Sequence, residues 1–311
     1  MITTLTKSVS KAAEFIKKGG IVAFPTETVY GLGANIFDET AIVKIFAAKK
    51  RPNDNPLIAH VGNLEQIENL VKEITPNARK FIDAFFPAAL TLVLPKAEKV
   101  PLIATANLET IGVRMPKNEL ALEFLRNCET PVVAPSANLS GKPSPTNWQA
   151  VFEDLNSRID CILQGEATEI GLESTVVDCT SDVPLILRSG AITLEDLREI
   201  VPETQIYKIT ENEQPKSPGL KHRHYSPRAK VILIQNSKFK IQNSSAFIGL
   251  NIPRKKFKLV KFCQSVEHYA HSVFAFFREC DARNIETIYC ETVDASGIGL
   301  ALMDRLKRAS E

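Results

Sequence analysis

Seven short apolar runs, each bounded by Gly, Pro or polar residues, recur through the first 190 residues of this 311-residue chain. Short β-branched runs of this kind are typical of buried strands. The expected strands are GIVAF (20–24), PLIAHV (56–61), LTLVL (90–94), IGVRM (111–115), PVVAP (131–135), STVVD (174–178) and PLILR (184–188). Between many of them lie segments with helical spacing, at 38–50, 118–127, 146–154 and 193–200. This intermixing predicts an α/β domain that ends near residue 200.

A second unit follows a polar stretch at 201–228 that prolines interrupt. Its expected strands are KVILIQ (230–235), AFIGL (246–250) and TIYCE (287–291), and its expected helices are 266–282 and 299–309. These elements predict a small α/β unit of about 80 residues. The predicted division is a large domain over 1–202, a linker over 203–228 and a small domain over 229–311.

The composition is that of a soluble globular protein. A net charge of +2 gives no global field for binding nucleic acid or an anionic membrane. No apolar run approaches the roughly 20 residues that a membrane span needs, and the N-terminal stretch lacks the features of a signal peptide. The six cysteines form no CxxC pair, which favours buried reduced thiols over a zinc site. We therefore expect a cytoplasmic protein with no membrane partner and no dedicated metal site.

The stretch FPTETVYGLG (24–33) follows a predicted strand and contains two closely spaced glycines. It matches neither the P-loop nor the GxGxxG pattern. The hydroxyls of Thr26, Thr28 and Tyr30 and the carboxylate of Glu27 could hold a small polar ligand. The alternative is an ordinary strand-to-helix turn that uses glycine for its tight dihedral angles.

Three cationic or titratable groups next to predicted strands are further candidates. Lys49 and Arg51, in KKRPNDNPL, could clamp a polyphosphate, although cations are favourable at any helix C-terminus. His60 lies inside the next strand and could belong to the site or to the core. Arg114 lies in the apolar run IGVRM, where an unpaired charge costs several kcal/mol. It therefore needs a carboxylate, either from the protein or from a ligand.

The densest polar loop is APSANLSGKPSPT (134–146), after a predicted strand, where open α/β sheets place ligand sites. Ser136, Asn138 and Ser144 can hydrogen-bond sugar hydroxyls or phosphate oxygens. The ends of further strands contribute Glu173, Ser174, Thr175 and Arg188. We find no nucleophilic triad and no metal-binding cluster. Together these residues indicate a cleft for a nucleotide and an acidic small molecule.

The stretch SPGLKHRHYSP (217–227) reads at first as a linker, because Pro and Gly exclude a helix or a central strand. Its centre nevertheless carries more side-chain chemistry than a plain tether needs. The residues concerned are Lys221, His222, Arg223, His224 and Tyr225.

Six motifs in order closely resemble those of the YrdC-type threonylcarbamoyl-AMP synthases, in their longer, two-domain form. They are FPTETVYGLG, KKRPNDNPL, IGVRMP, APSANLSGKPSPT, GLESTVVD and SPGLKHRHYSP. The likeness covers residues of about 15–200 and the linker, and it reappears in GIGLALMDRLKRAS (297–310). It implies an open, twisted mixed sheet with a large concave cavity, followed by a small Rossmann-like α/β domain.

The resemblance also implies a reaction. The family are ATP-dependent nucleotidyltransferases that make threonylcarbamoyl-AMP and pyrophosphate from L-threonine, bicarbonate and ATP. Mg²⁺ would arrive with ATP, without a tightly bound cofactor. The product would pass to a threonylcarbamoyl-transferase complex, which modifies tRNA next to the anticodon.

The resemblance assigns roles to particular residues. L-Threonine would be held by Thr26, His60, Arg114 and Ser174. Lys49 and Arg51 would act in catalysis by offsetting charge on the leaving pyrophosphate. ATP would be bound by Lys49, Arg51, Asn55, Thr110, Ser136, Asn138, Ser144, Arg188 and Tyr225. Tyr225 and its cationic neighbours would form a lid that keeps water from a labile mixed anhydride.

Three other functions are alternatives. A nucleic-acid-binding scaffold would show a steep salt dependence of binding. A carbamoyl-transfer module could act on another acceptor, as related domains do in hydrogenase maturation. A regulatory protein could bind ATP without turnover. Pyrophosphate release that requires both threonine and bicarbonate distinguishes the synthase from all three.

Overall fold

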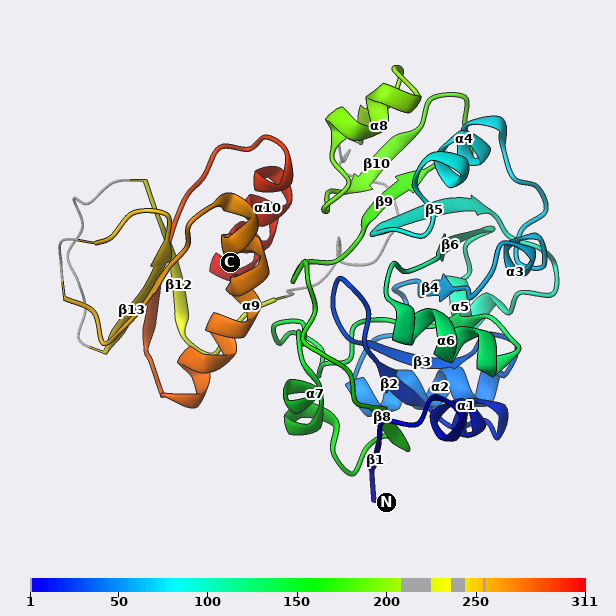
Figure 1. Cartoon of the computed structure of the whole chain (residues 1–311), viewed down its shortest axis with the longest axis horizontal. Helices are drawn as coiled ribbons and strands as arrows, with labels where there is room; N and C mark the ends of the chain where they lie inside the picture. The colour runs from blue at the N-terminus through cyan, green and yellow to red at the C-terminus, as the bar shows by residue number, and fades with distance from the viewer. Residues whose placement is uncertain (1, 208–224, 236–243, 254–255) are drawn as a thin grey trace.

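The computed structural model describes residues 2–207, 225–235, 244–253 and 256–311, which form a large and a small α/β unit beside one another (Figure 1). The predicted fold class is confirmed, because each unit is built on its own sheet. The predicted lid at 217–227 lies outside the described residues except for 225–227. The boundaries drawn at 202 and 229 stay a prediction, and the large sheet continues to residue 206.

Eleven strands form the large sheet in the order β1-β8-β2-β3-β7-β4-β6-β5-β9-β10-β11. Parallel and antiparallel pairs are interspersed, since β4 runs parallel to β6 and antiparallel to β7. The strands are β1 Thr4–Thr6, β2 Val22–Phe24, β3 Gly31–Asn35, β4 Ile58–His60, β5 Leu90–Pro95, β6 Thr110–Arg114, β7 Val132–Val133, β8 Cys161–Leu163, β9 Thr175–Asp178, β10 Leu185–Arg188 and β11 Gln205–Ile206.

Helices cover both faces of this sheet. One apolar cluster joins α1 and α6 to β2, β7 and β8, and a larger one joins α2, α4 and α7 to the other face. Helix α2 has Asp38 as its N-cap, because the Asp38 side chain accepts a hydrogen bond from the Ala41 N–H at 3.0 Å. The helices are α1 Val9–Lys17, α2 Glu39–Lys49, α3 Glu65–Glu68, α4 Pro76–Phe85, α5 Leu102–Thr105, α6 Glu119–Cys128, α7 Trp148–Leu155 and α8 Leu194–Ile200.

Of the two interpretations of FPTETVYGLG, the strand-to-helix turn is wrong, because Gly31 and Gly33 lie inside strand β3. Their role is close packing. A Cβ on Gly33 would approach Val132 Cγ1 to 2.6 Å, and a Cβ on Gly31 would lie 3.2 Å from the ring of Phe24. A side chain at Gly33 would displace Val132, and one at Gly31 would press on the Phe24 ring. Residues 26–30 therefore form the connection between two adjacent antiparallel strands.

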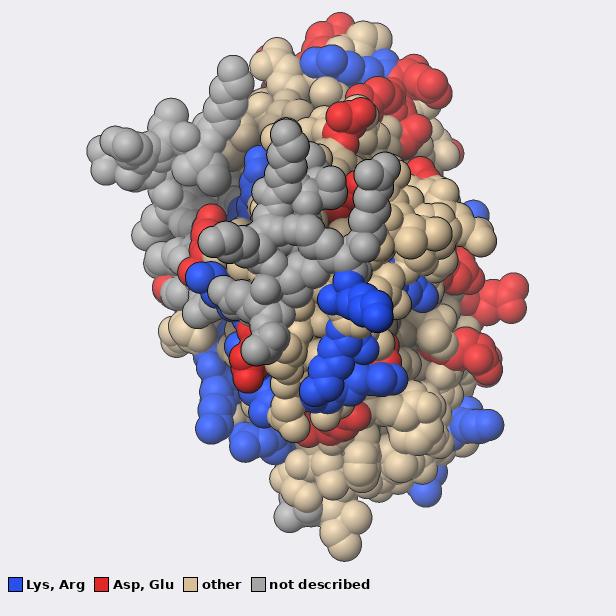
Figure 2. Space-filling view, turned by 90° about the vertical axis from the view of Figure 1, so that its left-hand side faces the viewer, with Lys and Arg blue, Asp and Glu red and all other residues tan. Residues whose placement is uncertain are grey.

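The small unit has four parallel strands in the order β12-β15-β13-β14, with α9 and α10 between this sheet and the large unit (Figure 1). Its apolar core includes Val29 and Leu172 of the large unit, so the two units share buried surface. Basic and acidic side chains both occur on its outer side (Figure 2). The elements are β12 Lys230–Ile234, β13 Ser245–Gly249, β14 Leu259–Phe262, α9 Val266–Ala282, β15 Thr287–Glu291 and α10 Ile298–Ser310.

All six cysteines are buried and unpaired, as predicted. Burial raises the pKa of each thiol, to about 12 for Cys128, Cys161 and Cys280. Among the described residues, no helix is both long and apolar enough to cross a membrane.

Candidate active site

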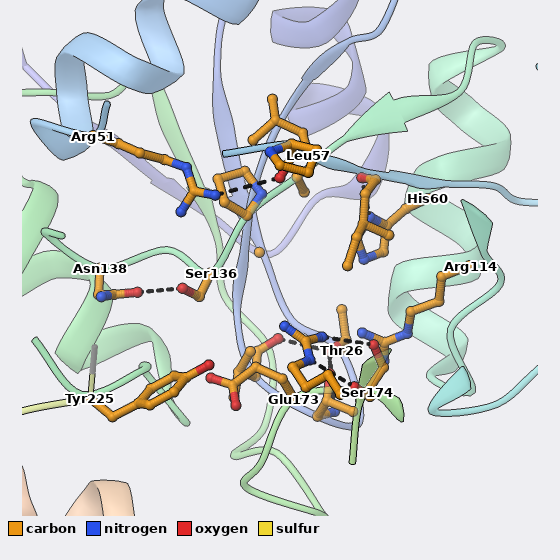
Figure 3. A pocket seen from close by; sticks show the side chains of 18 of the residues that line it. Thr26, Arg51, Leu57, His60, Arg114, Ser136, Asn138, Glu173, Ser174 and Tyr225 are labelled. Atoms are coloured by element: carbon orange, nitrogen blue, oxygen red, sulfur yellow. Dashed lines mark hydrogen bonds between the residues drawn. The ribbon is translucent and has the colours of Figure 1, made fainter. Parts of the chain in front are cut away.

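A cavity lies where β4, β6 and β10 end, facing the small unit (Figure 3). Open α/β sheets commonly place ligands at the carboxyl ends of their strands. The structure brings most of the predicted site residues together here. Those that line the cavity are Thr26, Arg51, His60, Arg114, Ser136, Asn138, Ser174, Arg188 and Tyr225.

The sheet end of the cavity is formed by His60 and Arg114, which lie opposite each other on parallel strands β4 and β6. Arg114 Nη2 lies 2.8 Å from Glu27 Oε1, and the two side chains are only 5% and 3% exposed. The open question about Arg114 is therefore answered by a protein carboxylate. In the described structure Arg114 Nε has no hydrogen-bond partner. The guanidinium thus retains donor capacity at the edge of the cavity.

His60 is a neutral side chain at this end. Burial, helped by the nearby Arg114 charge, lowers the pKa of His60 to about 3. The His60 and Phe24 rings pack edge to face, with their centroids 5.7 Å apart. An uncharged imidazole next to Arg114 can accept or donate one hydrogen bond without adding a second positive charge.

The floor of the cavity ties three polar side chains together. Arg188 donates from Nε to the Ser174 carbonyl at 3.1 Å and from Nη2 to Ser174 Oγ at 3.2 Å. Ser174 Oγ also lies 2.8 Å from Thr91 Oγ1. Nearby, Thr26 Oγ1 donates to the Val29 carbonyl at 2.7 Å. These bonds fix the hydroxyls before any ligand enters.

The loop end of the cavity is formed by Arg51, Ser136, Asn138 and Lys142. Arg51 Nη2 donates to the carbonyls of Asn55 at 3.3 Å and Pro56 at 3.5 Å. Ser136 Oγ donates to Asn138 Oδ1 at 2.6 Å. Burial lowers the pKa of Arg51 to about 10, which leaves it charged at neutral pH.

Lys49 does not line the cavity, in contrast to the predicted direct contact with phosphate. It is 1% exposed, and its Nζ donates to the carbonyls of Ser136 and Asn138, each at 2.5 Å. Burial holds the pKa of Lys49 well below its usual range. Lys49 therefore fixes the backbone of the loop that carries Ser136 and Asn138.

Three other predicted ATP ligands also lie away from the lining. Asn55 and Ser144 are buried behind it, and Ser144 Oγ donates to Glu173 Oε1 at 2.6 Å. Thr110 begins β6, whereas Arg114 ends it at the cavity. At ~3.3 Å per residue the two lie about 13 Å apart along the strand. The ATP contact of Thr110 therefore stays a prediction.

Sequence reasoning identified Glu173 and Tyr225 as candidates but missed Arg305, which contacts both of them. Glu173 and Tyr225 line the cavity, and Arg305 of α10 lies behind them. The Tyr225 ring stacks on Phe274, with 5.3 Å between centroids. One signal was available, since Arg305 falls between Leu302 and Leu306 on the apolar stripe of its helix.

The described residues contain no group of three His, Cys, Asp or Glu side chains that could hold a metal ion. The cavity lining instead carries four cations, Arg51, Arg114, Lys142 and Arg188, against one acid, Glu173. Such a lining suits an anionic ligand.

Two family models together match nearly the whole chain. The model described as "Telomere recombination", named for Sua5, YciO and YrdC, matches residues 14–190. The model described as "Threonylcarbamoyl-AMP synthase, C-terminal domain" matches residues 192–311.

Two curated relatives are similar along almost their full length. Threonylcarbamoyl-AMP synthase of Pyrococcus abyssi is 42% identical, over 96% of this chain and 93% of its own. The Bacillus subtilis protein of the same name is 38% identical, over 99% and 94%. Among solved structures, P. abyssi Sua5 complexed with L-threonine superposes with a TM-score of 0.90 and 41% identity, over 99% of this chain and 97% of that one.

Proposed function

Because this chain belongs to the threonylcarbamoyl-AMP synthase family and is an enzyme of that kind, we propose that its cavity condenses L-threonine, bicarbonate and ATP. The observation that carries the proposal is the cavity lining, with its excess of cations and its two different ends. Threonine has one carboxylate, whereas ATP carries several negative charges. The sheet end suits the first and the loop end suits the second.

In the proposed reaction the threonine amine takes up CO₂, derived from bicarbonate, and loses a proton to form a carbamate. A carbamate oxygen then attacks the α-phosphorus of ATP, and the bond to the leaving pyrophosphate breaks. Arg51, Lys142 and Arg188 offset the charge that develops on the phosphates. ATP enters as its Mg²⁺ complex, because Mg²⁺ in such sites is held largely by substrate phosphates and water.

Threonine would bind at the sheet end, with its carboxylate on the free Nε edge of Arg114. The solved complex of P. abyssi Sua5 with L-threonine supports this choice of substrate. Thr26 and Ser174 lie near enough to the same cavity floor to orient the amino acid, and His60 adds an uncharged ring. The product would be handed to a transferase complex and then to tRNA. We place this reaction in the cytoplasm, which agrees with six reduced thiols.

The test is pyrophosphate release by the purified protein. Release from ATP should require both L-threonine and bicarbonate, and L-serine should support it poorly. Release without threonine would indicate hydrolysis of ATP to AMP and pyrophosphate. Bound ATP without any release would favour the ATP-binding module.

A further inference from the structure

Arg305 is a buried cation that belongs to the small unit but makes contacts in the large one. It lies in α10 and is 1% exposed. Its Nε donates to Glu173 Oε2 at 3.0 Å, and its Nη2 donates to the Ser189 carbonyl at 3.0 Å. Its remaining arm, Nη1, is held by Asp304 at 2.7 Å. A side chain that is fixed on all three nitrogens is positioned by the fold and has little rotamer freedom left.

The groups that Arg305 contacts form one wall of the cavity. Glu173 lines the cavity directly, and Ser189 follows the lining residue Arg188. The Arg305 guanidinium also lies over the ring of Tyr225, 5.4 Å from its centroid. Such cation–π contacts are stronger in desolvated sites. Tyr225 itself has a left-handed backbone, with φ of 66°. The ring contacts both Arg305 and Phe274, and these contacts hold Tyr225 in a backbone conformation that residues other than glycine rarely adopt.

The charge of Arg305 bears on what the cavity can bind. Glu173 is the one acidic side chain among the described lining residues. Burial would raise the pKa of the Glu173 carboxyl, but the charges of Arg305 and Arg188 hold it below its usual value. Glu173 is consequently an anion whose charge is offset from behind by Arg305. Without that partner, a buried negative charge would face an anionic ligand.

We propose that Arg305 is a positioning residue through which the small unit completes the active site. It fixes the Glu173 carboxylate and the Tyr225 ring, and it cancels a negative charge next to the bound nucleotide. The inference rests on the proposed function for the identity of the ligand. It gives the small unit a direct part in shaping the cavity, beyond covering it.

A second arginine of the small unit provides a matched comparison. Arg278 of α9 also crosses to the large unit, where its Nη2 lies 2.8 Å from Asp154 Oδ2 and 2.6 Å from the Pro143 carbonyl. Neither Arg278 nor Asp154 lines the cavity, and Asp154 keeps a second partner in Lys142. Both arginines hold the units together, whereas only Arg305 contacts the wall residues Glu173 and Tyr225.

The experiment compares Arg305→Met with Arg278→Met in the full chain. We measure KM for ATP and for threonine by pyrophosphate release, and ATP affinity by calorimetry. Arg305→Met should raise KM for ATP about tenfold or more and change KM for threonine by less than about threefold. Arg278→Met should change both by less than about threefold. Arg305→Lys, which keeps the charge but not the planar fork, should give a smaller rise than Arg305→Met.

A second substitution, which removes the negative charge of Glu173, makes the test more specific. Glu173→Gln combined with Arg305→Met leaves no uncompensated carboxylate, so its ATP affinity should return to within about threefold of Glu173→Gln alone. Equal effects of Arg305→Met and Arg278→Met would overturn the proposal, because domain docking would then explain both. Failure of the double variant to recover its ATP affinity would also overturn the proposal.

If the wild type releases no pyrophosphate, the proposed reaction fails. The ATP affinities measured by calorimetry then still test the role of Arg305. An unchanged ATP affinity in Arg305→Met, or no ATP binding by the wild type, would then refute the inference.

Discussion

The two ends of the cavity hold their cations in different ways (Figure 3). At the sheet end, Arg114 projects from a central strand and is paired with the buried carboxylate of Glu27. At the loop end, Arg51 donates to backbone carbonyls, and the neighbouring backbone is fixed by Lys49. The sheet end is therefore close to neutral as an ion pair, whereas the loop end presents net positive charge.

This difference shows how one cavity can bind two substrates of different charge at different ends. A near-neutral pair in a rigid sheet suits a small zwitterion, whose own carboxylate and amine also nearly cancel. Net positive charge on loops suits a multiply charged polyphosphate. Variants that change one end should therefore alter one KM and leave the other nearly unchanged.

The largest effect is expected at the sheet end, for Arg114→Leu. This change leaves Glu27 charged and unpaired in a buried site, which costs about 3–5 kcal/mol. The free energy of unfolding, measured with urea, should fall by that amount, and threonine-dependent pyrophosphate release should be lost. Adding Glu27→Leu should recover much of the stability without restoring activity. An unfolding midpoint equal to that of the wild type would contradict the prediction.

The next effect is expected at the loop end, for Lys49→Met. Removing the ammonium group frees the carbonyls of Ser136 and Asn138. We expect a loss of about 2 kcal/mol of stability and a rise of about tenfold in KM for ATP. Lys50→Met, at the exposed neighbouring position, should change neither quantity measurably. A parallel rise in KM for threonine would show that the two ends are not independent.

A smaller, pH-dependent effect is expected for His60 at the sheet end. Its folded pKa of about 3 lies below the ordinary 6.5, so only the unfolded state takes up the proton as pH falls. Stability is thus lost as pH falls below about 6.5. Between pH 7 and pH 5 the wild type should lose about 2 kcal/mol more than His60→Gln. Urea titrations at the two pH values measure this difference, and parallel losses would argue against a neutral buried imidazole.

The smallest effect is expected for Thr110→Val, which belongs to neither end. Its position at the start of β6 predicts that KM for ATP stays within about twofold of the wild type and that stability changes by about 0.5 kcal/mol or less. Steady-state pyrophosphate release is sufficient to measure it. A several-fold rise in KM for ATP would instead support the predicted role of Thr110 as an ATP ligand.

Much of the fold was predictable because its buried elements carry strong periodic patterns. The bounds of α9 and β15 agree with the prediction, and the seven apolar runs of the large unit all contain strands. Strand β3 was missed because its glycines serve packing against Phe24 and Val132, which sequence does not show. Helix α1 was missed although Val9, Ala12 and Ile16 follow helical spacing.

The site was predictable where the motif residues lie on strand ends, and less so where function depends on partners distant in sequence. The pairing of Arg114 with Glu27, and of Glu173 with Arg305, joins segments that only the tertiary fold brings together. Lys49 was assigned to phosphate because it lies next to a loop that leads into a buried strand and because the family resemblance implied that role. In the structure its long side chain is buried, and its Nζ donates to the backbone carbonyls of Ser136 and Asn138 instead.

The six buried thiols leave the native chain with little reactivity toward cysteine-labelling reagents. With every thiol pKa raised, few thiolates form at neutral pH, and maleimide reagents should react slowly with the native chain. A cysteine introduced at one exposed position on each unit would then be labelled selectively. Two dyes placed in this way could follow the distance between the units through a catalytic cycle in the otherwise native sequence.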